Sequence, residues 1–274
     1  MPIKSTSSSS IADEIRDLLN CGLRAVLVTV VESDRLVVGT KLLVRETGES
    51  SGDLGDQDLN DAVVAYAAGF LSARDDTRTI RVSEFAPALE NVSQSLVLFE
   101  RIEAEPNLVI AGAGHVGASL ARLAALVGYR VTLIDDRAEF VAPQMFQSAP
   151  EKQINLVAAQ SWATAIRDAI GNGPGVSIAI VTRGHKQDED CLRAALAANP
   201  DYVGMIGSKR RTNIVLDKLR EEGFDGAQLE RVRAPVGLDI GAVSPEEVAL
   251  AILAEIVAER RGGKGGSLSA WRRA

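Results

Sequence analysis

The second half of the chain alternates two kinds of segment, and this alternation constrains its fold more than any other feature. Short runs rich in Val, Ile and Leu, at residues 107–111 and 130–134, are typical of buried strands. A segment with apolar residues at helical spacing, 116–127, lies between them. Strands that alternate with helices pair in parallel, because each helix returns the chain to the same end of the sheet. We therefore predict an α/β fold with a parallel sheet in this half.

The same pattern continues to the end of this half. It predicts further strands over 177–182 and 202–206 and helices over 188–198, 210–222 and 245–260. The last helix has a clear start signal. Ser244 is placed as its N-cap, Pro245 suits the first helical position, and Glu247 completes a capping box.

The first hundred residues have a different order and predict a smaller α/β domain, 1–102. A break at 103–106 separates it from a second domain, 107–262, and the Gly-rich stretch 263–274 is expected to be a flexible tail. Residues up to Ser10 are likewise expected to be frayed. The elements expected in the first domain are helices over 11–19 and 62–71, strands over 25–31, 41–45, 77–85 and 94–101, and an acidic loop over 52–61.

Composition excludes several classes of partner. With a net charge of −7 and 4% aromatic residues, the chain is a poor match for nucleic acid or an anionic membrane surface. We see no apolar run long enough for a membrane span and no signal peptide. Cys21 and Cys191 have no metal-ligand spacing and suggest no disulfide framework, so we expect packed thiols in a reducing, cytoplasmic setting.

A glycine-rich turn carries the strongest chemical signal. Gly112, Gly114 and Gly117 form GxGxxG between a predicted strand and a predicted helix, and Asp135 ends the next strand. In this context the first glycine permits a tight turn, the second lets a pyrophosphate approach, and the third lets the helix pack closely. Asp135 is then expected to accept hydrogen bonds from ribose hydroxyls. The alternative is a tight turn with no ligand.

Both histidines of the chain lie in Gly-rich turns at strand ends, where ligands of parallel sheets bind. His115 either donates to a phosphate or only begins the helix, and His185 is the candidate proton carrier, with no catalytic residue assigned. Asp188 is read as an N-cap rather than a catalytic acid. Further candidates for cofactor binding at later strand ends are Arg183, Gly207, Ser208, Lys209, Arg210 and Asp239. No metal site is assigned, neither to the acidic loop nor to His185 with Asp239.

Four segments together resemble one known family. Residues 112–140, 181–196, 202–211 and 234–261 are similar, in this order, to the C-terminal domain of xanthine dehydrogenase accessory proteins of the XdhC/CoxI type. The resemblance implies a Rossmann domain behind a smaller N-terminal domain, a homodimer, and binding of the molybdenum cofactor as molybdopterin or its cytosine dinucleotide. It also implies a client molybdoenzyme of the xanthine dehydrogenase type and contact with a sulfurtransferase.

The N-terminal half departs from this family's pattern. A Gly-Ser-x-Pro stretch is replaced by residues 32–36, and a Gly-Gly-Cys-x-Glu motif by residues 55–60. Asp58 then stands at the cysteine position and Asn60 at the glutamate position. A carboxylate cannot supply a thiolate, so sulfur chemistry at this place is in question.

Three functions follow from these observations. The first is a maturation factor that binds the molybdenum cofactor and delivers it to its client. The second is an NAD(P)-dependent oxidoreductase, which the glycine-rich turn and Asp135 also fit. The third is a degenerate partner subunit, which the replacements at Asp58 and Asn60 favour.

Overall fold

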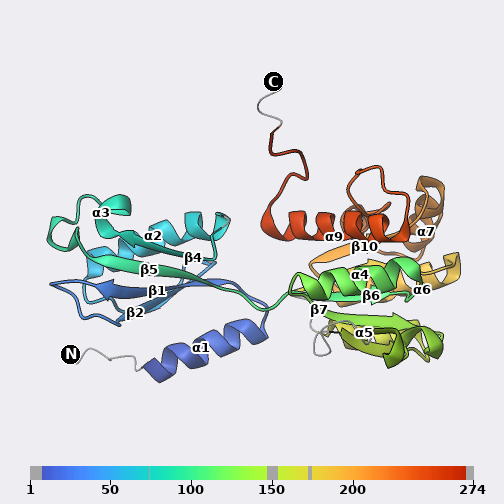
Figure 1. Cartoon of the computed structure of the whole chain (residues 1–274), viewed down its shortest axis with the longest axis horizontal. Coiled ribbons are helices and arrows are strands. Elements are labelled where there is room, and N and C mark those ends of the chain that lie inside the picture. The colour runs from blue at the N-terminus through green and yellow to red at the C-terminus, as the bar shows by residue number, and fades with distance from the viewer. Residues whose placement is uncertain (1–7, 74, 147–153, 172–174, 270–274) are drawn as a thin grey trace. The chain divides into compact units, whose positions relative to one another are not determined.

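The computed structural model describes residues 8–73, 75–146, 154–171 and 175–269. The chain divides between Ala104 and Glu105 into two units, each with its own sheet (Figure 1). The segment expected to be frayed up to Ser10 joins helix α1, Ser8–Asn20, while residues 1–7 lie outside the described part. The expected tail lies outside it from position 270, and 263–269 contain no helix or strand.

The first unit is built on an antiparallel sheet with strand order β3-β2-β1-β5-β4. Its central strand β1 pairs with β2 on one side and with β5 on the other. The expected strand 77–85 is shorter in the structure, because Val82–Phe85 turns into the short helix α3. The strands are β1 (Ala25–Glu32), β2 (Lys41–Arg45), β3 (Ser50–Gly52), β4 (Thr77–Arg81) and β5 (Leu96–Ile102).

Two helices cover opposite faces of this sheet because its strands are apolar on both sides. Leu42 and Val44 join the core beneath α2, Gln57–Ser72, whereas Leu43 between them packs with α1. Successive side chains of a strand point to opposite faces, so one strand serves both cores. Helix α2 begins five residues before the expected start and takes in the end of the acidic loop.

The second unit contains a five-stranded parallel sheet in the order β10-β9-β6-β7-β8, which confirms the predicted fold class. Strand β8, at the sheet edge, is not among the predicted strands, although four of its five residues are apolar, as in β6; in the structure none of the five is fully buried. The strands are β6 (Asn107–Ala111), β7 (Arg130–Asp135), β8 (Ile154–Ala158), β9 (Val176–Ile180) and β10 (Tyr202–Met205).

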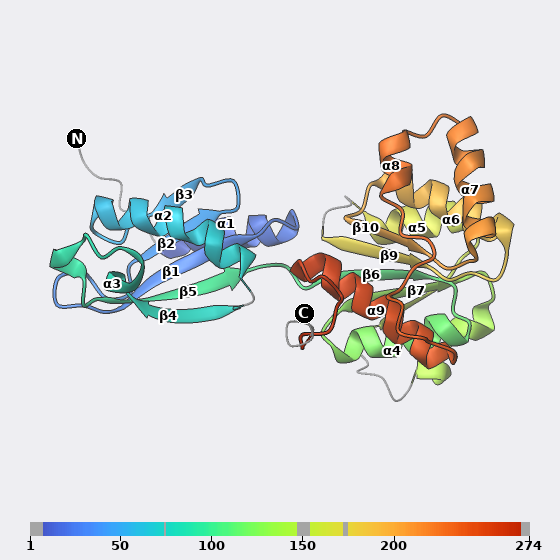
Figure 2. The ribbon, with the colours of Figure 1, turned by 90° about the horizontal axis from the view of Figure 1, so that it is seen from above.

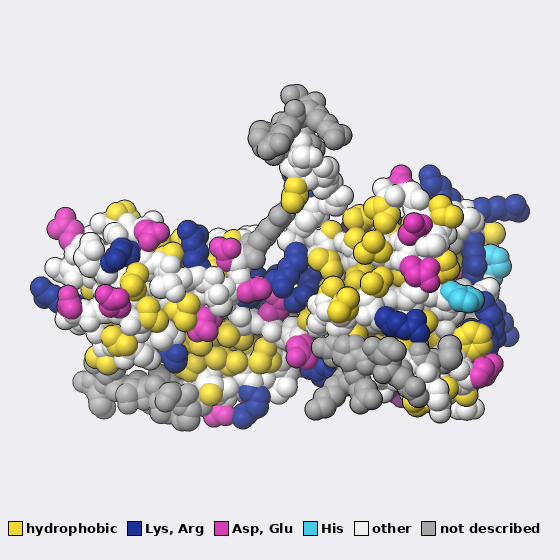
Figure 3. Space-filling model, in the orientation of Figure 1, with side chains coloured by type: hydrophobic (Ala, Val, Ile, Leu, Met, Phe, Trp, Pro, Cys, Tyr) yellow, Lys and Arg dark blue, Asp and Glu magenta, His cyan; other side chains and the backbone are white. Residues whose placement is uncertain are grey.

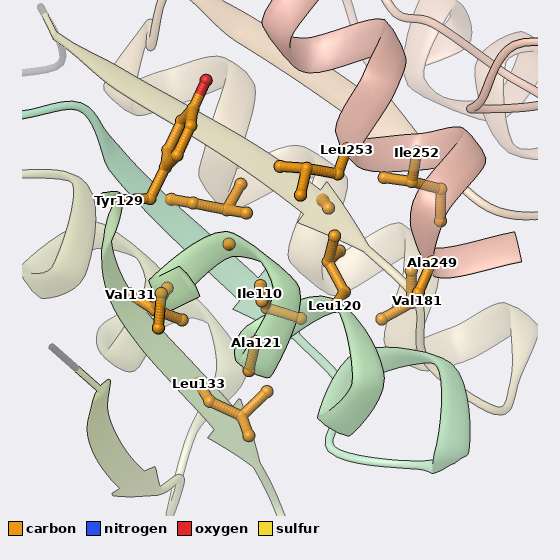
Figure 4. Close-up of a cluster of buried hydrophobic side chains, with 14 of the residues drawn as sticks. Ile110, Leu120, Ala121, Tyr129, Val131, Leu133, Val181, Ala249, Ile252 and Leu253 are labelled. Atoms are coloured by element: carbon orange, nitrogen blue, oxygen red, sulfur yellow. The ribbon is translucent and has the colours of Figure 1, made fainter. Parts of the chain in front are cut away.

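Helices cover both faces of the parallel sheet, as Figure 2 shows from above. On one face, Leu120 of α4 and Ile252 of α9 pack over Ile110 and Leu133 of the strands (Figure 4). The capping box of α9 forms as predicted, between Ser244 and Glu247. The helices are α4 (His115–Leu126) and α9 (Pro245–Arg261) on this face, and α5 (Trp162–Ile170), α6 (His185–Ala198), α7 (Lys209–Glu221) and α8 (Gly226–Glu230) in the other core.

Candidate functional site

The chain reverses the direction of strand addition between β6 and β9. From β6 the sheet grows through β7 to β8, whereas from β9 it grows the other way to β10. The loops that leave two such neighbouring strands run in opposite directions and leave a crevice at their carboxyl ends. The glycine-rich turn after β6 and the segment after β9 both lie at this point.

Two glycines of the turn are required by close packing. Gly112 has a φ of +112°, and a Cβ there would lie 2.6 Å from the Val181 carbonyl oxygen. A Cβ on Gly117 would lie 1.8 Å from the Gly112 carbonyl oxygen. Gly114 differs, since a Cβ there would meet no described atom within 4 Å. Only the space in front of the turn gives a reason for a glycine at 114.

Helices α4 and α6 begin without a side-chain cap. Their N-cap residues are Gly114 and Gly184, and neither helix start receives a side-chain hydrogen bond from its cap. In contrast, serines or an aspartate cap α2, α5, α7 and α9. The first N–H groups of a helix need acceptors and carry a partial positive charge. Two uncapped helix starts at one crevice therefore favour an anionic ligand.

A pocket lies in front of these helix starts, with about 330 Å³ of empty space that includes part of the open solvent. Four predicted residues contribute to its wall. Its lining consists of Gly112, Gly114, Asp135, Asp136, Arg137, Trp162, Val181, Thr182, Arg183 and Gln187.

Asp135 is almost completely buried and holds the turn together. Its carboxylate accepts hydrogen bonds from the Ala113 N–H at 2.7 Å, and from the backbone N–H, Nε and Nη2 of Arg137 at 3.0, 2.8 and 3.0 Å. Burial acts to raise the pKa of Asp135, but these hydrogen bonds outweigh it and the pKa is lowered. The carboxylate is therefore ionised at neutral pH and tied to Arg137.

A second Asp–Arg pair lies at the mouth of the pocket. Arg183 Nη2 lies 3.1 Å from Asp136 Oδ2, and both side chains keep substantial exposure, 48% and 30%. Trp162, at the first position of α5, adds a partly buried aromatic surface to the pocket wall. The pocket thus combines cations, open N–H groups and one flat apolar side chain.

The structure corrects the role expected for Asp188. Gly184, not Asp188, is the N-cap of α6, because the helix begins three residues before the expected start. Asp188 is fully buried and accepts hydrogen bonds from Thr182 Oγ1 and Arg211 Nη2. Burial raises its pKa, and these two partners lower it only in part. Through Thr182 and Arg211, the carboxylate links the pocket wall to the start of α7.

The other predicted site residues are not part of the pocket lining. His115 and His185 are exposed at the first positions of α4 and α6, and Figure 3 shows both histidine side chains at the surface. Ser208 caps α7, and Arg211 rather than its neighbours reaches into the interior. The remaining residues lie outside the lining as well: Gly117, Gly207, Lys209, Arg210 and Asp239.

Sequence reasoning missed six residues of the lining: Asp136, Arg137, Trp162, Val181, Thr182 and Gln187. Two signals were available in the chain. Arg137 follows the expected ribose acid by two residues, and Ser161 before Trp162 is a typical N-cap at the start of a helical pattern. The sequence pattern assigns no element between β7 and β9, so Trp162 had no place in the predicted sheet.

In the first unit, the acidic loop is satisfied by its own backbone. Asp56 caps α2 by accepting from the Leu59 N–H, and buried Asn60 accepts from the Leu54 N–H and donates to Asp53. Asp58 is exposed in the first turn of α2. Within the described residues, no group of three or more His, Cys, Asp or Glu side chains is arranged to hold a metal.

The two cysteines differ from each other. Cys191 is buried, as expected, and burial raises the pKa of its thiol. The expectation of a packed thiol is wrong for Cys21, which is exposed just after α1 where the chain turns toward β1. Among the helices of the described segments, none is long and apolar enough to cross a membrane.

The fold and the pocket define a Rossmann-type domain joined to a smaller α/β unit. A family model for the XdhC Rossmann domain matches residues 108–256, and a model for the XdhC and CoxI family matches residues 18–83. The chain therefore belongs to the XdhC family, as the resemblance of its motifs had predicted.

Three relatives place the chain more closely. It is 33% identical over 161 residues to the uncharacterized protein YqeB of Escherichia coli K12, covering 59% of this chain and 28% of that protein. It is 26% identical over 249 residues to a probable xanthine dehydrogenase subunit of Bacillus subtilis 168, covering 91% and 64%. It is 39% identical over 69 residues to the Escherichia coli molybdenum cofactor insertion chaperone PaoD, covering 25% and 22%. The chain thus spans less than two thirds of each of these proteins.

A solved structure shares the architecture. A protein described as a xanthine dehydrogenase from Bacillus halodurans superimposes with a TM-score of 0.62 at 17% identity, covering 96% of this chain and 75% of the other. At this identity the match establishes the fold alone.

Proposed function

We propose that the protein is a maturation factor that binds the molybdenum cofactor and delivers it to a xanthine dehydrogenase-like molybdoenzyme. The observation that carries this proposal is the pocket at the two uncapped helix starts, in a chain similar over 69 residues to a molybdenum cofactor insertion chaperone. Delivery requires binding without consumption, and no catalytic residue has been assigned in the pocket.

The pocket's chemistry fits the two ends of such a ligand. The cofactor is a pterin with a terminal phosphate, and it is cargo here rather than a resident group. The open N–H groups at Gly114 and Gly184, with Arg137 and Arg183 beside them, suit the phosphate. Trp162 offers a flat surface on which a planar ring can stack.

The first unit is proposed to take part without a thiolate at the position of Asp58. Asn60, at the family's glutamate position, is occupied with holding the loop, because it bonds both Leu54 and Asp53. We therefore propose a carrier that leaves sulfur chemistry to a sulfurtransferase partner. A homodimer in the cytoplasm is part of the same proposal.

The test is the pterin content of the purified chain. The chain is expressed in a host with active molybdenum cofactor synthesis, and bound pterin is released, oxidised and identified by fluorescence and mass. We expect about one pterin per chain, lost in Gly114→Val and reduced in His115→Ala. Gly226→Val is the matched control, since a Cβ also meets nothing within 4 Å there and Gly226 lies outside the pocket. Wild-type protein without pterin contradicts the proposal.

A second candidate function has one observation in its favour. The strand order and the turn at Gly112 are those of dinucleotide-binding domains, which suits an NAD(P)-dependent oxidoreductase. It would be supported by NAD(P) in the purified protein together with hydride transfer to a carbonyl substrate that His185→Ala abolishes. Pterin in place of NAD(P) excludes it.

A further inference from the structure

The carboxylate of Asp135 has no acceptor position left for a ligand. Its two oxygens together accept four hydrogen bonds, one from the Ala113 N–H and three from Arg137. A carboxylate offers about four acceptor positions, so all of them are filled. The side chain is also only 2% exposed. A ribose diol therefore finds no acceptor position on Asp135, and the next acid, Asp136, lies 3.1 Å from Arg183 Nη2 and 3.9 Å from Arg137 Nε.

Arg137, which covers the Asp135 carboxylate, is the charged group that the pocket offers to a ligand at this place. Its guanidinium is held on one edge by Asp135 and on one face by the Phe140 ring, whose centroid lies 3.6 Å from Cζ. Nη1 makes no hydrogen bond to any residue in the described part of the chain, and the side chain is 29% exposed. A cation fixed on two sides with free N–H groups is suited to a phosphate oxygen.

A ligand can displace the ion pair between Asp136 and Arg183, whereas the pair between Asp135 and Arg137 is held by several hydrogen bonds. Asp136 and Arg183 meet through one contact and are both open to solvent, and such exposed ion pairs contribute little to stability. The formal charges of the two aspartates and two arginines cancel. An anionic ligand can therefore pair with Arg183 only by displacing Asp136. Because this ion pair is exposed, breaking it costs little free energy.

We propose that the pocket selects a ligand with a planar heterocycle whose hydroxyl facing Arg137 carries a phosphate monoester over the same ligand with that hydroxyl free. Arg137 is the selecting residue, Arg183 is the second cation, and Trp162 is the stacking surface. This inference rests on the ligand-binding role of the pocket in the proposed function. It adds the selecting residue, Arg137, and the discrimination that Arg137 makes: a nucleotide with an extra phosphate, or a phosphorylated pterin, binds in preference to the same ligand without that phosphate.

The test uses Trp162 as an internal reporter. The chain has two tryptophans, so Trp271→Phe in the full-length protein leaves Trp162 alone. Two matched pairs of probes are titrated by fluorescence and calorimetry: 2′,5′-ADP against 5′-AMP, and 6-hydroxymethylpterin phosphate against 6-hydroxymethylpterin. We expect the phosphate-bearing member of at least one pair to quench Trp162 and bind at least tenfold more tightly. The pair that responds identifies the source of the phosphate. Equal binding, or no binding of any probe, overturns the proposal.

Three variants locate the effect. Arg137→Ala is expected to abolish the phosphate preference while improving 5′-AMP binding, because Asp135 becomes free. The matched control Arg167→Ala, exposed on α5 beside Asp168 and outside the pocket, keeps the preference. Asp136→Asn is expected to raise phosphate affinity several-fold by releasing Arg183. If Arg137→Ala fails to fold, Asp136→Asn decides: a gain supports the proposal and no gain overturns it.

The outcomes separate this inference from the proposed function. Pterin in the purified protein with no phosphate preference defeats the inference alone. A phosphate preference at Trp162 in protein that never carries pterin defeats the proposed function and leaves the inference standing.

Discussion

The starts of α2 and α4 present the same backbone groups and treat them in opposite ways. At α2, Asp56 caps the helix, and Asn60 ties down the preceding loop. At α4, Gly114 provides no side chain and the N–H groups face a pocket. A helix start whose N–H groups are capped adds stability, whereas one left open has N–H donors to offer a ligand. The difference shows why the binding site is expected in the second unit.

The largest loss of stability is expected when a side chain is added where α4 packs closely against the glycine-rich turn. Gly117→Ala places a Cβ 1.8 Å from the Gly112 carbonyl oxygen, so the free energy of unfolding should fall by about 3 kcal/mol or more. Gly69→Ala in α2, where a Cβ meets nothing within 4 Å, should raise it by roughly 0.5–1 kcal/mol. Denaturant unfolding measures both. Equal effects would show that α4 tolerates a shift away from the turn.

The next largest loss of stability is expected in the loop before α2, which Asn60 holds in place by hydrogen bonds. Asn60→Ala removes the acceptor of the Leu54 N–H and a donor to Asp53, and should lower the free energy of unfolding by roughly 1–3 kcal/mol. Pterin content should stay unchanged. A loss of pterin without a loss of stability would mean that Asn60 serves the ligand rather than the loop.

Removing the cap of α2 and adding a cap to α4 should reverse the difference between the two helix starts. Asp56→Ala removes the cap of α2 and should lower the free energy of unfolding by about 1 kcal/mol, with no effect on ligand. Gly114→Asp adds a cap to α4 and should raise stability by up to about 1 kcal/mol while abolishing binding of phosphate-bearing probes. Thermal unfolding and calorimetric titration are measured on both. Retained phosphate binding in Gly114→Asp would show that the start of α4 is not the anion site.

The smallest expected effect is the contribution of Asp135 to the change of stability with pH in the acid range. The pKa of Asp135 is lowered in the folded protein, so its stabilising contribution is present above the unfolded pKa of about 3.9 and is lost as the pH falls below it. Unfolding of wild type and Asp135→Asn between about pH 5 and 2 should show a shallower dependence in the variant. Parallel curves for Asp135→Asn and wild type would contradict the assignment.

The fold was predictable where the apolar pattern is strong. Strands β6 and β2 begin and end at the expected residues, and the parallel pairing of the second unit follows from strand–helix alternation. Prediction failed at β3, where Ser50, Ser51 and Gly52 carry no apolar signal, and at β8, although its apolar content equals that of β6. It also shortened α6, since His185, Lys186 and Gln187 lack the apolar spacing that marks a helix.

The candidate site was predictable in its glycine-rich turn and in two charged residues of its wall, Asp135 and Arg183. The roles of Gly112 and Gly117 in tight packing follow from the motif, and the structure gives the close approaches that require them. The other charged residues were harder to place. Lys209 and Arg210 were preferred to Arg211, yet only Arg211 meets buried Asp188, because the turn of a helix decides which of three adjacent side chains points inward.

The sequence by itself determined the class of sheet, the glycine-rich turn and the family, because these depend on local spacing and on motifs in a fixed order. Only the tertiary structure decided that Arg137 fills the acceptor positions of Asp135, that Arg183 meets Asp136, and that Trp162 lines the same pocket. These contacts join the ends of three strands far apart in the chain. Which side chains meet across such a crevice depends on strand order and side-chain geometry, and no local pattern records either.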